Sequence, residues 1–173
     1  MGQIEQNMID SVQRAVIDEY EVVVHWYNMW CREVAEREIK RKNKLLSGKE
    51  KTCYELNIKI TEKSFSIYWQ DVLFVQTGTK KRRLTTHIPF YTKQSTQIYY
   101  HPNQFSRASS WELELILQTE QRLIASRNRL NHLSNIIRSL SYYNKYSSNE
   151  AKFKPLKDVI DLSLKKSIAH YKN

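Results

Sequence analysis

Four consecutive basic residues after a glycine turn are the strongest candidates for a chemical role in this sequence. Lys80, Lys81, Arg82 and Arg83 follow "QTGT" and lie between two apolar, β-prone runs. Lysine and arginine on a β-ribbon can reach the phosphates and guanine edges of duplex DNA. Side chains alternate between the two faces of a strand, so one alternate pair would contact DNA while the other faces solvent. Either Lys80 with Arg82 or the other two can fill that role.

The charge distribution along the chain favours a nucleic-acid contact over a solvated loop. No Asp or Glu occurs between residues 72 and 111, where Lys93 and Arg107 add to the four bases. A second acid-free run covers residues 121–149. Solvated surfaces normally mix both signs, and the net charge of +10 is typical of proteins that bind a polyanion.

Two tyrosines beyond the basic turn could add stacking to this contact. Aromatic rings stack on exposed bases of nucleic acids, and Tyr99 and Tyr100 lie in a β-prone run. A half-buried position at the edge of a sheet is the alternative. Trp69, in contrast, lies on the apolar face of a predicted strand and is expected in the core. The residues expected to contact nucleic acid are Lys80, Lys81, Arg82, Arg83, Lys93, Tyr99, Tyr100 and Arg107.

Several classes of function are disfavoured by what the sequence lacks. The five histidines show no metal-binding spacing, and there is no glycine-rich phosphate loop. Cys31 and Cys53 are expected as buried, reduced thiols. We therefore expect a non-enzyme without metal or cofactor. No apolar run is long enough for a transmembrane helix and no secretory signal is visible, so a cytoplasmic protein without a membrane partner is expected.

Hydrophobic periodicity predicts the elements that position these residues. Residues 4–46 contain no proline or glycine, and their apolar residues recur every three, four or seven positions, which predicts a helix on the order of 60 Å long. Apolar and polar residues then alternate, which predicts a β-meander over residues 53–100. Helical spacing returns over residues 110–143 and, after a polar break, over residues 155–170.

The second long helix has its own start signal and a regular seam. Ser109 and Glu112 form the pattern of a capping box, and Ile116 opens an apolar series that repeats every seven residues. An acidic first helix and a basic second helix favour an antiparallel pair. Ion pairs are then expected from Glu19 and Glu21 to Arg127, Arg129 or Arg138. The predicted fold is α+β, a single domain over residues 1–173: two long antiparallel helices flanking a small three- to four-stranded antiparallel sheet, plus a short C-terminal helix.

Several segments together resemble the MobI family, auxiliary proteins of conjugative plasmids and integrative conjugative elements. The similarity lies in "SIYWQDVLFV" before the basic turn, "HIPF" after it, and the helix entry "ASSWEL" with its continuation "TEQRLIASRNRL" and "IIRSL". It covers residues 54–140. The resemblance implies a cytoplasmic factor that acts at the origin of transfer and helps a relaxase to start DNA processing without cutting DNA itself. It carries over no set of DNA-contacting residues.

Two classes of function follow. The first is a DNA-binding accessory factor at the origin of transfer, with duplex DNA and a relaxase as partners and the basic β-ribbon as the DNA contact. The second is a protein-interaction module whose helical seam docks a relaxase or another partner without sequence-specific DNA binding. RNA in place of DNA is a variant of the first class, and a homodimer through the long helices is compatible with both.

Overall fold

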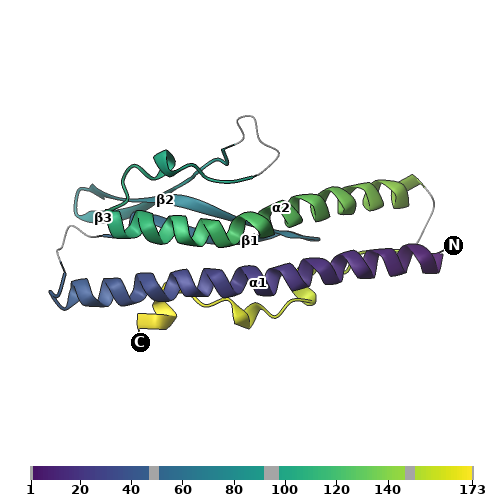
Figure 1. Cartoon of the computed structure of the whole chain (residues 1–173), viewed down its shortest axis with the longest axis horizontal. Coiled ribbons are helices and arrows are strands. Elements are labelled where there is room, and N and C mark those ends of the chain that lie inside the picture. The colour runs from purple at the N-terminus through teal and green to yellow at the C-terminus, as the bar shows by residue number, and fades with distance from the viewer. Residues whose placement is uncertain (1, 47–50, 92–97, 147–150, 173) are drawn as a thin grey trace.

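Two antiparallel helices lie side by side over one face of a small sheet (Figure 1). The computed structural model describes residues 2–46, 51–91, 98–146 and 151–172 of the chain. The helices are α1 (Gly2–Lys42) and α2 (Ser110–Tyr146). Their register is fixed at two points. Glu19 forms the predicted ion pair with Arg129, and the Arg122 guanidinium lies 5.1 Å from the centre of the Trp26 ring.

The sheet has three antiparallel strands in the order β1-β2-β3. Its members are β1 (Tyr54–Ile60), β2 (Phe65–Thr77) and β3 (Lys80–His87). Residues 98–100, expected as part of the meander, contribute an isolated bridge between Tyr99 and Tyr91. The α+β class predicted from the sequence is therefore confirmed.

Helix α1 carries a continuous apolar stripe, which must be buried against other elements of the fold. Helix α1 ends at Lys42 rather than at residue 46. The reason is that Lys44 takes a left-handed backbone conformation, with φ 61°, and the Leu45 N–H bonds to the Lys40 carbonyl at 2.9 Å. This closing bond satisfies a terminal carbonyl, as glycine-ended helices usually do. The buried stripe consists of Ile9, Val16, Tyr20, Val23, Tyr27, Trp30 and Val34.

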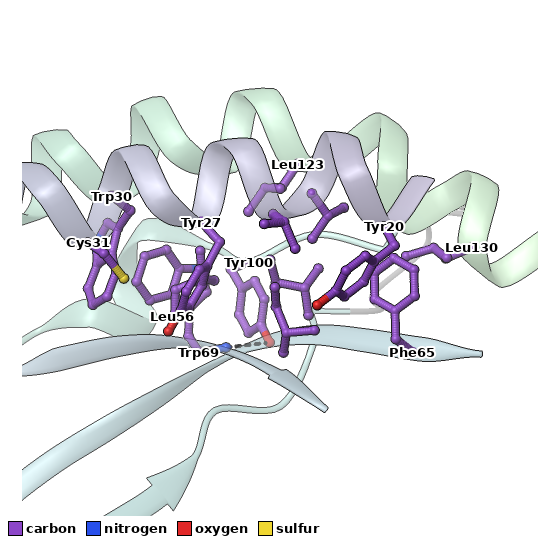
Figure 2. Packing of buried hydrophobic residues seen from close by; sticks show 14 of the residues in the cluster. Tyr20, Tyr27, Trp30, Cys31, Leu56, Phe65, Trp69, Tyr100, Leu123 and Leu130 are labelled. Atoms are coloured by element: carbon purple, nitrogen blue, oxygen red, sulfur yellow. Dashed lines mark hydrogen bonds between the residues drawn. The ribbon is translucent and has the colours of Figure 1, made fainter. Parts of the chain in front are cut away.

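Alternation along β1 and β2 supplies the other half of the core. Tyr54, Leu56 and Ile58 of β1 share a face with Phe65, Ile67 and Trp69 of β2, and all six are buried. The rings of Trp30 and Trp69 meet edge to face at 5.4 Å, and Tyr20 meets Phe65 in the same way at 5.3 Å. Figure 2 shows these aromatic rings between the helices and the sheet. Edge-to-face pairs add to the free energy of burial.

Strand β2 is long because it serves two partners. It pairs with β1 over residues 65–71 and with β3 over residues 70–77. The hairpin therefore continues past Tyr54, the first residue of β1. All eight residues of β3 are exposed. Gly78 makes its turn with φ 61°, a conformation that favours glycine. The four basic residues were predicted at the start of a strand, and they are the first four residues of β3, directly after this turn.

A buried ion pair connects α2 to β2. Arg127 donates to both carboxylate oxygens of Glu120, at 2.6 and 2.7 Å, and their side chains are 3% and 5% exposed. The Trp69 indole N–H also donates to Glu120, at 2.7 Å, and Arg127 donates to the Ile67 carbonyl at 3.2 Å. Arg127 thus faces the sheet and does not pair with the acids of α1, as one of the expected alternatives had it.

The C-terminal region is not the helix predicted over residues 155–170. It forms three short 3-10 turns, Leu156–Asp158, Leu162–Leu164 and Ile168–Lys172, which run along α1 (Figure 1). Its backbone forms short bonds within each turn, and it also bonds to the Glu62 carbonyl and to amide side chains of α1. Gln13 donates to the Lys154 carbonyl at 2.7 Å. Asn28 donates to the Leu164 carbonyl at 2.6 Å and accepts from the Lys166 N–H at 2.8 Å. Tertiary contacts have overridden the helical pattern of this segment.

We expect Arg127→Met to lower the free energy of unfolding by about 3–5 kcal/mol, because it leaves Glu120 buried without its counter-charge. Adding Glu120→Gln should recover most of this loss, since the amide still accepts from Trp69 and carries no charge. Urea denaturation measures both changes. Arg129→Met is the matched control, because this half-exposed partner of Glu19 should contribute about 1 kcal/mol or less. Equal losses for the two arginine variants would contradict the prediction.

Candidate nucleic-acid interface

The pairing of β2 with β3 sorts the hairpin residues onto two faces. Residues directly opposite each other in an antiparallel pair point to the same side, and the register places Val75 opposite Arg82 and Phe74 opposite Arg83. The helix-side face, on the same side of the sheet as Trp69, carries Leu73, Val75, Lys80, Arg82 and Leu84. The outer face carries Phe74, Gln76, Lys81 and Arg83.

The two bases of the outer face are engaged within the protein. Arg83 forms an ion pair with Glu55 of β1. The Lys81 ammonium lies 5.1 Å from the centre of the Phe74 ring, within the range of a cation–π contact. These contacts are exposed and contribute little to stability. They nevertheless hold the Arg83 guanidinium against Glu55 and the Lys81 ammonium against Phe74.

The two bases of the helix-side face are available. Within the part of the chain that the structure describes, Lys80 and Arg82 have no ion-pair partner. Their neighbours on this face, Leu73, Val75 and Leu84, are 40%, 41% and 50% exposed. The face thus combines free positive charge with accessible apolar surface.

Arg107 holds the base of the hairpin. Its guanidinium pairs with Asp71 and reaches the Val72 carbonyl at 3.4 Å, and its backbone N–H donates to the Tyr54 hydroxyl at 3.1 Å. These contacts fall where β2 leaves β1 and continues into the hairpin. Arg107, expected as a nucleic-acid contact, therefore has a positioning role in the structure.

Glu112 fixes the start of β1 rather than the start of α2. One carboxylate oxygen accepts from the backbone N–H groups of Cys53 and Tyr54, at 2.7 and 2.9 Å. The predicted capping box is therefore wrong, and the Ser109 hydroxyl has no hydrogen-bond partner among the described residues. Glu112 is fully buried, and this burial raises the pKa of its carboxyl to about 7 although the two N–H donors lower it.

A readable signal for Glu112 and the buried pair existed in the sequence. Glu112, Glu120 and Arg127 lie on the same helical stripe as Ile116 and Leu123, at spacings of three, four and seven. Charged residues on an apolar stripe are rarely solvated, because the stripe faces the core. The stripe thus indicates that all three side chains are buried, but not which partners they bind: Glu112 was expected in a capping box and Arg127 as one possible partner of the acids of α1.

The tyrosines lie away from the hairpin surface. Tyr100 is 3% exposed. Its hydroxyl accepts from the Trp69 backbone N–H at 3.2 Å, and its ring lies 4.9 Å from the Arg127 guanidinium, so no ring face is left for a base. Tyr99 is half-buried, with its ring 5.5 Å from that of Tyr91. Lys93 lies outside the described residues.

The described residues offer no assembled centre of another kind. No three His, Cys, Asp or Glu side chains among them come close enough together to hold a metal ion. Cys31 is buried and Cys53 half-buried, and both thiols are free. Among the described residues, the helix-side face of the hairpin is where basic side chains without an ion-pair partner lie beside exposed apolar side chains.

The fold and this surface define a small α+β protein with four consecutive basic residues on an exposed β-ribbon. The chain belongs to the MobI family: the family model described as MobI protein matches residues 19–141, from the middle of α1 to near the end of α2. It is thus an auxiliary protein of conjugative transfer. No curated protein and no solved structure matches it. In the described ranges, no helix is long and apolar enough to cross a membrane.

We expect stability to fall as the pH rises from about 4.5 to about 7 because of Glu112. The folded state keeps its proton up to about pH 7, whereas the unfolded state loses it near the ordinary value, so folding binds the proton in this window. Glu112→Gln imitates the protonated acid and should remove this slope. Relative to wild type, the variant should gain about 2–3 kcal/mol between pH 5 and pH 8.

Urea denaturation at both pH values measures this difference. Glu114→Gln serves as the control, because Glu114 is an exposed residue of the same helix. Wild-type and Glu112→Gln curves that stay parallel across the pH range would contradict the assignment.

Proposed function

We propose that this protein binds duplex DNA at the origin of transfer and helps a relaxase to begin conjugative DNA processing. The β2–β3 hairpin is its DNA contact. One observation carries the proposal: an exposed two-stranded ribbon presents four consecutive bases, and its strand β3 lies entirely outside the core. Ribbons of this kind enter the major groove in several classes of DNA-binding protein.

Electrostatics support the assignment. No acid lies between residues 72 and 111, and of the four hairpin bases only Arg83 has an acidic partner in the described chain. Each base that meets a phosphate releases counterions, so binding would weaken steeply with salt. The hairpin is held by Arg107 and Glu112, so it can be presented without a large loss of conformational entropy.

The proposed role is non-catalytic. The relaxase would cut DNA, and this protein would mark or shape the site where cutting starts. Such a role places the protein in the cytoplasm with the plasmid or integrated element. It needs neither a cofactor nor a membrane partner.

A second candidate, a protein-interaction module, is favoured by a different surface. Exposed apolar residues occur on the N-terminal part of α1 and the C-terminal part of α2, at the end of the molecule opposite the hairpin turn (Figure 1). Such patches commonly mark protein contacts, here with a relaxase or with a second copy of the chain. These residues are Ile4 (69% exposed), Met8 (50%), Ile136 (44%), Tyr142 (66%), Tyr143 (50%) and Tyr146 (66%).

Replacing all four hairpin bases by glutamine tests the proposal. We expect Lys80→Gln, Lys81→Gln, Arg82→Gln and Arg83→Gln together to weaken binding to origin-region duplex DNA. The slope of log affinity against log salt should drop by about 2–4, since each lost phosphate contact removes about 0.9. Fluorescence anisotropy of labelled DNA, titrated at several salt concentrations, measures both quantities.

The control removes the same charge elsewhere, from Lys145, Lys152, Lys154 and Lys157, which are exposed residues. An unchanged affinity and slope in the hairpin variant would contradict the hairpin as the contact. A tight relaxase complex without any DNA binding at physiological salt would favour the second candidate. Stronger competition by single-stranded RNA than by duplex DNA would replace DNA by RNA as the ligand.

A further inference from the structure

We infer that the helix-side face of the hairpin is the face that reads DNA. Lys80 and Arg82 make the polar contacts, Val75 and Leu84 lie against the edges of the bases, and the basic end of α1 holds the neighbouring phosphates. This inference rests on the proposed function and goes beyond it, because it selects one of two faces and names the chemistry of recognition.

The first argument is the difference in how the two faces use their charge. The outer face has Arg83 paired with Glu55 and Lys81 over the Phe74 ring. A DNA phosphate on that side would have to approach Glu55 and compete with it for the arginine. Among the described hairpin residues, the helix-side face carries no acid beyond Asp71, which pairs with Arg107. Its bases can meet a phosphate without giving up a contact.

The second argument is the presence of exposed aliphatic side chains beside Lys80 and Arg82. Val75 lies directly opposite Arg82, and Leu73 directly opposite Leu84, on the same face. For exposed aliphatic side chains on a β-ribbon, transfer out of water lowers the free energy. In the major groove the thymine methyl group gives them an apolar partner, and guanine gives Arg82 a pair of acceptors. The face therefore suits a site that contains both thymine and guanine.

The third argument is the direction in which this face looks. It lies on the side of the sheet that the helices occupy, and the C-terminal end of α1 reaches the same end of the molecule as the hairpin turn (Figure 1). That end of the helix is basic, with Lys40, Lys42 and Lys44 exposed. DNA against the outer face would lie away from these lysines. DNA against the helix-side face can meet both.

Two variants with equal loss of charge separate the faces. Lys80→Gln with Arg82→Gln removes both positive charges from the helix-side face. Lys81→Gln with Arg83→Gln removes both from the outer face. With a labelled duplex of mixed sequence, we expect the first pair to weaken binding by at least about tenfold and the second by less than about threefold. The comparison is conservative, because losing Arg83 also leaves the negative charge of Glu55 uncovered.

The α1 contact has its own matched test. Replacing Lys40, Lys42 and Lys44 by glutamine should lower the salt slope, because flanking phosphate contacts are lost. Replacing Lys152, Lys154 and Lys157 removes the same charge beside the N-terminal part of α1 and should leave the slope unchanged. Equal slopes for the two triple variants would remove α1 from the interface.

The apolar contact is tested with duplexes that the wild-type protein selects from a random pool. Replacing thymine by uracil removes only the methyl group, and we expect wild type to bind the uracil form about three- to fivefold more weakly. Val75→Thr, combined with Leu84→Thr, keeps β-prone side chains and should abolish this difference. Circular dichroism and thermal unfolding confirm that each variant is folded.

The outcomes separate this inference from the proposed function. Stronger loss from the outer pair, equal loss from both pairs, or no uracil effect would overturn the helix-side assignment while DNA binding stands. Absence of duplex binding by wild type would overturn both.

Discussion

The buried pair of Glu120 and Arg127 is the interaction on which the arrangement of α2 and the sheet depends. Both charges are excluded from water, so each needs the other, and Glu120 also needs the Trp69 indole N–H. Only one placement of α2 over β2 satisfies all these donors and acceptors. A purely apolar seam would tolerate sliding by a turn, whereas a misplaced pair would leave an uncompensated charge. The pair thus specifies register as well as contact.

This fixed register reaches the hairpin through a single strand. The first half of β2 is gripped by the core through Phe65, Ile67 and Trp69, and the second half forms the exposed ribbon. Arg107 and Glu112, both near the start of α2, hold the place where the two halves meet. The hairpin is therefore a direct continuation of a core strand. A surface built in this way can keep its charges at a constant spacing.

Much of this arrangement could be predicted from the sequence, because period and turn chemistry are local properties. The stripe of α1, the alternation of β1 and β2 and the Gly78 turn all follow from them. The roles of Tyr100 and Glu112 could not be predicted in the same way, since each depends on a partner more than thirty residues away. The 155–170 segment has helical spacing, yet Gln13 and Asn28 bind its backbone. The two faces of the hairpin become distinct only when Glu55 is placed beside Arg83.

The C-terminal turns along α1 also determine how this chain can fold. Asn28 and Gln6 bond to backbone groups 136 and 146 positions further along, so this side of α1 stays uncovered until residues 152–164 have been synthesised. Contacts of such sequence separation slow folding. During synthesis this side of α1 is therefore exposed to solvent until the C-terminal turns pack against it. A nascent chain of this kind exposes part of α1 to association with other molecules until the C-terminal turns have formed.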